Sequence, residues 1–189
     1  MLNWLKGEQF LVLDTETTGL DNNAQIVELG LIDQNGKKLI DTLVKPTIQI
    51  PDEAIAIHGI TTEQAMDEGV DWSEVNEQLF EILISPFERK DLVIYNADYD
   101  VRLINQTSLL HDDNSVFDML HLPHVTCAML AYAEYWGEKS TRSFHHGGFA
   151  FQSLLFACKQ QGVSYSKNAH RALADCQMTL DLLKTVWAK

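Results

Sequence analysis

Cysteine, proline and long apolar stretches are scarce in this sequence of 189 residues. The chain has 3 cysteines, without CxxC spacing, and 4 prolines. An odd number of such cysteines excludes a disulfide framework and is typical of small buried side chains in a reducing compartment. No apolar run approaches the roughly 20 residues of a membrane helix, and the first residues lack the features of a signal peptide. We therefore expect a cytoplasmic protein that has no membrane contact.

Basic residues are in deficit as well. Lys and Arg number 14 against 27 Asp and Glu, which gives a formal net charge of −13 at pH 7. At first sight this argues against a nucleic-acid partner, because phosphate binding normally uses a basic surface. A basic surface is not the only way to bind phosphate, because clustered carboxylates can bind divalent cations that present positive charge to the phosphate. The local arrangement of the acids has to decide.

The apolar pattern predicts one α/β domain over residues 1–189, since no linker, repeat or low-complexity tract interrupts the chain. The predicted strands cover residues 10–16, 25–33, 37–45 and 91–95, and Asn35-Gly36 is a strong hairpin signal between the second and third. The predicted helical segments cover residues 51–57, 61–65, 72–84, 97–108, 125–135, 149–161 and 169–186, with a loop over 136–148. This order indicates a mixed central sheet flanked by helices.

Two acids end the first predicted strand. Side chains alternate along a strand, so Asp14 and Glu16 project from the same face. Two like charges a few ångströms apart repel and are hard to keep ionised unless a cation lies between them. Taken alone, the pair has a simpler interpretation as solvated acids in a turn, because Thr17-Thr18-Gly19 follows.

A third acid heads the apolar stripe of a predicted helix. Leu103, Ile104 and Thr107 follow Asp100 at i+3, i+4 and i+7. An acid in that position is costly unless it is paired or bound to metal. Asp98 lies in the first turn, where a carboxylate favourably faces unpaired backbone N–H groups. We therefore assign Asp98 to capping and Asp100 to a site.

The last predicted helix carries a further acid and a histidine. Asp175 borders its apolar stripe, and His170 lies five residues earlier. Five steps of about 100° place the two on different sides of a regular helix, so they converge only if His170 precedes the helix. A histidine in the loop before a helix is better suited to accept a proton than to act as a rigid metal ligand. For His170 alone, a surface histidine near a helix terminus is the simpler interpretation.

These residues belong to three segments that occur in order along the chain. They are Leu13-Asp14-Thr15-Glu16-Thr17-Thr18-Gly19-Leu20 continuing into Ile26-Val27-Glu28-Leu29-Gly30, then Tyr95-Asn96-Ala97-Asp98-Tyr99-Asp100, and His170-Arg171-Ala172-Leu173-Ala174-Asp175. Between the first two lies His58-Gly59-Ile60-Thr61. The ordered set resembles the DEDDh branch of the DnaQ-like 3′→5′ exonucleases, such as RNase T and the epsilon proofreading subunits of polymerases. One departure is Tyr95, where many members carry a histidine.

The resemblance implies an RNase H-like fold and a phosphodiesterase that uses two divalent metal ions, Mg²⁺ or Mn²⁺. By position, the four metal-binding acids correspond to Asp14, Glu16, Asp100 and Asp175, and the general base corresponds to His170. Carboxylates suit these ions, which prefer oxygen ligands. A neutral imidazole can accept a proton around pH 7. The expected product is a nucleoside 5′-monophosphate.

The indications for substrate binding are weaker. Family analogy implies contacts with the terminal nucleotide from the Thr15 backbone and from the side chains of Thr17, Thr18 and Asn96. His58 and Ile60 either shape the pocket for the terminal base or fix a turn against the sheet. The sequence leaves these two interpretations open.

The expected partner is a nucleic acid with a free 3′ end, with DNA favoured over RNA. Within the enzymes, a proofreading subunit of a DNA polymerase and an RNA 3′-end-processing exoribonuclease remain alternatives, and a polymerase or a second copy of the chain is a candidate protein partner. The chain ends soon after the last motif, so we expect a free-standing exonuclease. A non-catalytic binding module is disfavoured, because loss of turnover would normally erase one of the five catalytic positions.

Overall fold

A computed structural model of the chain describes residues 8–83, 91–112, 125–141, 148–164 and 170–188. At its centre is a five-stranded sheet with the strand order β3-β2-β1-β4-β5. The strands are β1 (Phe10–Thr17), β2 (Ile26–Asp33), β3 (Lys38–Leu43), β4 (Asp91–Ile94) and β5 (Val125–Cys127). Because β1 pairs antiparallel with β2 and parallel with β4, the sheet is mixed, which confirms the predicted fold class.

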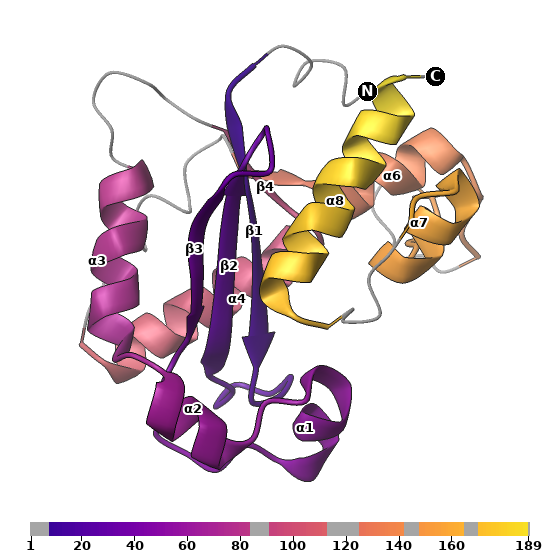
Figure 1. The fold of residues 1–189 in the computed structure, drawn as a ribbon. Coiled ribbons are helices and arrows are strands. Elements are labelled where there is room, and N and C mark those ends of the chain that lie inside the picture. Colours follow the sequence, from indigo (N-terminus) through magenta and orange to yellow (C-terminus); the bar gives the residue numbers. More distant parts are fainter. Residues whose placement is uncertain (1–7, 84–90, 113–124, 142–147, 165–169, 189) are drawn as a thin grey trace.

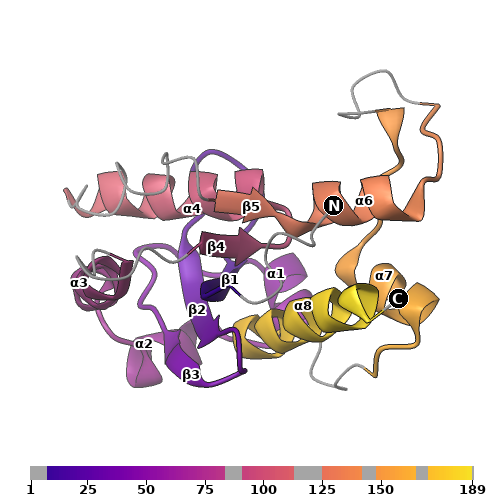
Figure 2. The same ribbon diagram turned by 90° about the horizontal axis from the view of Figure 1, so that it is seen from above.

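Helices cover both faces of the sheet (Figures 1 and 2). They are α1 (Asp52–His58), α2 (Thr62–Glu68), α3 (Trp72–Leu83), α4 (Ala97–Leu110), α6 (Ala128–Trp136), α7 (Leu154–Gln161) and α8 (Ala172–Trp187). The cluster of buried apolar side chains on one face includes α6, α7 and α8, and the cluster on the other face includes α3 and α4. The pair α1 and α2 lies at the end toward which β1 runs, beside a third apolar cluster (Figure 1).

The strand β1 lies between the two main cores. Its side chains alternate between the faces, as expected for a strand. Phe10 and Val12 pack with α7 and α8, whereas Leu11 and Leu13 pack with α3 and α4. The same alternation places Asp14 on the face that α8 covers. The apolar part of β1 thus fixes the direction in which the acids that follow it point.

The topology brings three chain segments to one edge of the sheet. Because β1 and β4 are parallel, their carboxyl ends lie at the same edge. Helix α4 starts directly after β4, and the first turn of α8 lies beside the same end of β1 (Figure 1). Residues that follow β1, begin α4 and begin α8 therefore meet there.

Three predicted helices begin later than expected. Helix α8 begins at Ala172 and not near residue 169, because His170 has a non-helical backbone with φ +69°. Residues 125–127 form β5, which pairs in parallel with β4, so α6 begins at Ala128. So short a strand depends on its neighbour in the sheet and leaves little periodicity in the sequence. Helix α7 begins at Leu154, because the Ser153 hydroxyl accepts the N–H of Phe156 as an N-cap. Residue 84, residues 142–147 and residue 169 of the predicted elements lie outside the described part of the chain.

Two expectations about composition concern the cysteines and the membrane. Cys158 and Cys176 are buried, Cys127 is partly buried, and all three are free thiols. Within the residues described above, no helix combines the length and the apolar character needed to span a bilayer.

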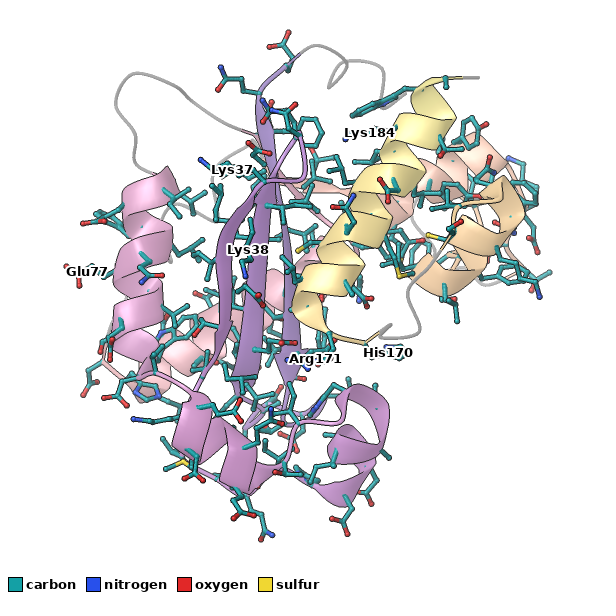
Figure 3. All side chains as sticks on the ribbon, in the orientation of Figure 1. Lys37, Lys38, Glu77, His170, Arg171 and Lys184 are labelled. Carbon is teal, nitrogen blue, oxygen red and sulfur yellow. The ribbon has the colours of Figure 1, made fainter. Side chains whose placement is uncertain are left out.

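The core beneath α3 can be tested with Leu79→Ala. Leu79 is fully buried, so the substitution leaves a cavity and should lower the free energy of unfolding by about 2–5 kcal/mol. The control is Glu77→Ala on the exposed side of the same helix (Figure 3), with an expected change within about 0.5 kcal/mol. Denaturant titration followed by circular dichroism measures both. Equal losses would contradict the placement of α3.

Candidate active site

Three carboxylates meet at the edge of the sheet where β1 ends. One oxygen from each of Asp14, Glu16 and Asp175 lies within 4.8 Å of the other two. The first two come from β1 and the third from the first turn of α8, and all three are partly buried. Oxygen ligands at this spacing are suited to a hard divalent cation.

Asp100 reaches this edge from α4. It is only 3% exposed, and its Oδ1 accepts the backbone N–H of Thr15 at 3.1 Å and the Thr15 hydroxyl at 2.7 Å. Thr15 lies between Asp14 and Glu16 on β1, so its side chain points to the α4 face. Asp100 thus lies outside the group of three converging carboxylates. It is close enough for its charge to raise the pKa of Asp14.

The four acids raise each other's proton affinity. Burial raises the pKa of Asp14 well above its usual range, and the charges of Asp100, Asp175 and Glu16 add to that effect. Burial, followed by the charge of Asp175, raises the pKa of Glu16 from 4.5 to about 8. Burial also raises the pKa of both Asp100 and Asp175. The guanidinium of Arg171 lowers the pKa of Glu16, but by less than burial and the acids raise it. The group is therefore short of positive charge.

His170 lies outside α8, two residues before its first residue Ala172, as its convergence with Asp175 requires. Its backbone has φ +69°, and its N–H donates to Oδ1 of Asp175 at 3.3 Å. The residue is exposed. The backbone of His170 is thus held beside the carboxylate of Asp175.

A pocket of about 490 Å³ opens in front of Glu16. Its walls are residues 16–21, Pro51, the α1 residues Glu53, Ala54, Ile57 and His58, and Asn96 and Tyr99 at the start of α4. The volume falls in the range of about 300–1,000 Å³ typical of small-molecule sites. Because Glu16 belongs both to this pocket and to the three-carboxylate group, a ligand seated here has one end against the acids.

His58 lines this pocket and also fixes a turn. Its Nδ1 accepts the N–H of Ile60 at 3.0 Å, so the ring hydrogen resides on Nε2, which donates to the Thr17 carbonyl at 3.2 Å. Burial lowers the pKa of His58, which favours this neutral form. Ile60 is 0% exposed and packs in the apolar cluster around α1 and α2. The sequence left open whether His58 and Ile60 shape a pocket or fix a turn. Both residues take part in the turn, and of the two only His58 lines the pocket.

The other predicted substrate-binding residues also differ in whether they line the pocket or make structural contacts. Thr17, Thr18 and Asn96 line the pocket. The Thr18 hydroxyl also accepts the N–H of Gln25, which closes the loop after β1. The N–H and hydroxyl of Thr15 are both engaged by Asp100, so Thr15 supports that carboxylate.

Residues 19–24, here called the rim loop, are held by three side chains of α4 that the sequence analysis missed. The Tyr99 hydroxyl donates to the Gly19 carbonyl at 2.9 Å, and Arg102 donates to the carbonyls of Leu20 and Asp21, each at 3.2 Å. Gln106 donates to the carbonyl of Ala24 at 2.9 Å. The sequence signal that could have identified Tyr99, Arg102 and Gln106 is their spacing of i, i+3 and i+7, which places polar side chains on one side of the helix. The Leu20 side chain is 80% exposed at the pocket rim.

Glu28 is a fourth residue whose role was not predicted. It is 2% exposed within β2, among apolar neighbours, and pairs with Arg171. An acid inside an apolar strand was the signal, of the same kind that identified Asp100.

Comparison with known proteins identifies the family. The family model described as "Exonuclease" matches residues 11–183. The chain is 44% identical over 181 residues to "Uncharacterized exonuclease CP81" of Escherichia phage 186, which covers 95% of this chain and 88% of that protein. It is 27% identical over 187 residues to the DNA polymerase III subunit epsilon of Pasteurella multocida, covering 93% and 67% of the two chains.

Solved structures share the fold. With E. coli exonuclease I in complex with a dT13 oligonucleotide, the TM-score is 0.70 at 19% identity, over 92% of this chain and 39% of that one. The family match spans the sheet and every segment that contributes an acid to its edge. The chain therefore belongs to the exonuclease family and has its RNase H-like fold.

Proposed function

We propose that this exonuclease removes nucleotides from the 3′ end of a nucleic acid strand in a metal-dependent reaction. We call the pocket of about 490 Å³ in front of Glu16 the terminal pocket. The observation that carries the proposal is the position of Glu16, which borders both the terminal pocket and the three-carboxylate group. A terminal nucleotide in the pocket would place its phosphate against the acids. A continuous groove is not needed for such a substrate, because only the last nucleotide has to enter.

The acids fit a pair of divalent cations. Four carboxylates with raised pKa values and little compensating positive charge favour a bound cation, and oxygen ligands favour Mg²⁺ or Mn²⁺. Asp14, Glu16 and Asp175 would hold one ion, and Asp100 would support a second, directly or through water. When bound, such ions neutralise charge on the phosphate and lower the pKa of water.

The chain's own residues would orient the substrate and move a proton. The pocket would orient the terminal nucleotide, and His170 would take the proton of the attacking water as general base. The water oxygen would bond to phosphorus while the bond to the 3′-oxygen of the penultimate nucleotide breaks. The product would be a nucleoside 5′-monophosphate and a strand shorter by one residue.

Single-stranded DNA is the substrate class we favour. It is supported by the dT13 oligonucleotide bound to exonuclease I, whose fold this chain shares, and by relatives named as subunits of a DNA polymerase. The net charge of −13 suits an enzyme that engages phosphate through cations rather than a basic surface. The epsilon relatives also support a second candidate role, proofreading beside a polymerase, which co-purification with a replicative polymerase would test.

Substitution of site residues should abolish turnover. Asp14→Ala and His170→Ala should each lower Mg²⁺-dependent degradation by at least about 10²-fold, the lower range for removing a general base. The matched control is Asp98→Asn, an exposed acid two residues before Asp100, which should leave the rate unchanged. The assay uses 5′-labelled DNA and RNA oligonucleotides with and without chelator. A ladder that shortens stepwise reports attack from the 3′ end, whereas immediate release of the label, or full activity of Asp14→Ala, would refute the proposal.

The free energy of unfolding in chelator should fall as the pH rises between 4.5 and about 8. In this window the unfolded Glu16 carboxyl has lost its proton, whereas the folded one, with its raised pKa, retains it. The stability contributed by this group is therefore complete below pH 4.5 and lost as the pH passes about 8. Glu16→Gln should flatten the dependence, and added Mg²⁺ should restore stability at the alkaline end. Urea titrations across the pH range measure this; a steeper slope in Glu16→Gln would contradict it.

A further inference from the structure

The first turn of α8 is capped from outside the helix. Its N-cap residue is Arg171, which makes no side-chain capping bond. Backbone N–H groups at a helix start need acceptors. That of Ala172 donates to Oε2 of Glu28 at 2.8 Å, so strand β2 supplies the cap across 144 positions of sequence. The helix end that carries Asp175 is thereby tied to the sheet.

The same glutamate binds the side chain of Arg171. Nε of Arg171 lies 2.9 Å and 3.1 Å from the two carboxylate oxygens of Glu28, and Nη2 lies 2.5 Å from Oε1. The Glu28 side chain is 3% exposed and that of Arg171 is 41% exposed. A buried carboxylate without a partner is costly, so this pair holds together strongly. Figure 3 shows Arg171 next to His170 at the start of α8.

Gly30 lets the helix approach the strand. Glu28 and Gly30 lie on the same face of β2, two residues apart. A Cβ at Gly30 would lie 2.7 Å from the carbonyl carbon of Ala172 and 2.7 Å from the nitrogen of Leu173, closer than real contacts allow. One turn further on, the Cys176 thiol donates to the Gly30 carbonyl at 3.3 Å. The backbone of α8 therefore rests directly on the strand.

We infer that Glu28, Gly30 and Arg171 form a seat for α8 that positions His170 and Asp175 against Asp14 and Glu16. We call these three residues the β2 seat: Glu28 and Gly30 belong to β2, and Arg171 is the N-cap of α8. The inference rests on the proposed function for the roles of His170 and Asp175. His170 is the neighbour of Arg171, and the N–H of Asp175 donates to the Arg171 carbonyl at 3.0 Å. Any displacement of Arg171 thus shifts the general base and an acid of the three-carboxylate group together.

Glu28 is a positioning residue and not another acid of that group. Among the described residues, the carboxylates that converge within 4.8 Å are Asp14, Glu16 and Asp175, and Glu28 stands outside them. Both of its oxygens already accept hydrogen bonds from Arg171 and Ala172. Glu28 therefore affects the reaction by fixing the position of α8.

The experiment compares Glu28→Gln, Arg171→Gln, the double variant and Arg171→Lys with the wild-type chain. Loss of the seat should lower kcat about 10–100-fold, the usual cost of removing a group that orients a metal ligand. The KM for the oligonucleotide should change far less, since the terminal pocket is intact. The double variant should be no slower than the slower single variant, because the two residues act as one unit. Arg171→Lys should recover part of the rate, since lysine keeps the charge but not the forked contact.

Two controls separate this role from simple stabilisation. Lys38→Gln breaks another ion pair, between Lys38 and Asp41 on β3, and should leave kcat unchanged. Leu79→Ala destabilises the opposite face of the sheet without touching the seat. If Glu28→Gln keeps the wild-type kcat, loses no more of it than Leu79→Ala, or combines additively with Arg171→Gln, the inference is overturned.

A readout without turnover distinguishes failure of the seat from failure of the proposed function. In Glu28→Gln, amide hydrogen exchange should accelerate across residues 170–178 and remain unchanged across α3, and Mn²⁺ should bind more weakly by calorimetry. If the wild-type chain degrades no oligonucleotide, the proposed function fails while these measurements still test the seat. Unchanged exchange across 170–178 would overturn the inference by itself.

Discussion

Mutual repulsion of carboxylates at one edge of the sheet is the constraint on which the rest of the site depends. Two ionised carboxylates about 5 Å apart repel by roughly 3 kcal/mol at an effective dielectric constant of about 20. Three such pairs among Asp14, Glu16 and Asp175 are comparable with the total stability of a typical domain, about 5–15 kcal/mol. Burial and this repulsion raise the pKa of all three groups, so the metal-free site binds protons more strongly than free carboxylates do. The two apolar cores supply the stability that holds the acids in place.

Much of the site was predictable because each of its acids violates a local rule. Asp14 and Glu16 lie on one face at the end of an apolar strand, and Asp100 interrupts an apolar helical stripe. His170 can converge with Asp175 only if it precedes the last helix. The structure places all of these at one edge of the sheet. These deductions needed only the periodicity of a single element, which a sequence displays directly.

What escaped prediction depends on contacts between distant segments. The three-residue strand β5 exists through its pairing with β4, and the pattern of residues 125–127 alone resembles the start of a helix. The ion pair of Glu28 and Arg171 joins positions 143 apart. The Thr15 hydroxyl donates to Asp100 and not to a substrate, and this contact depends on where α4 begins. An unusual residue can be recognised locally, but its partner is set by the topology.

The rim loop is held through its main chain. Tyr99, Arg102 and Gln106 bind carbonyl oxygens, which every amino acid possesses, so these contacts do not depend on which side chains the loop carries. The exposed side chains of Leu20 and Asn22 are consequently under little structural selection. Of the two, Leu20 lines the pocket, so the rim of the pocket can change by substitution there while the fold and the acids remain as they are.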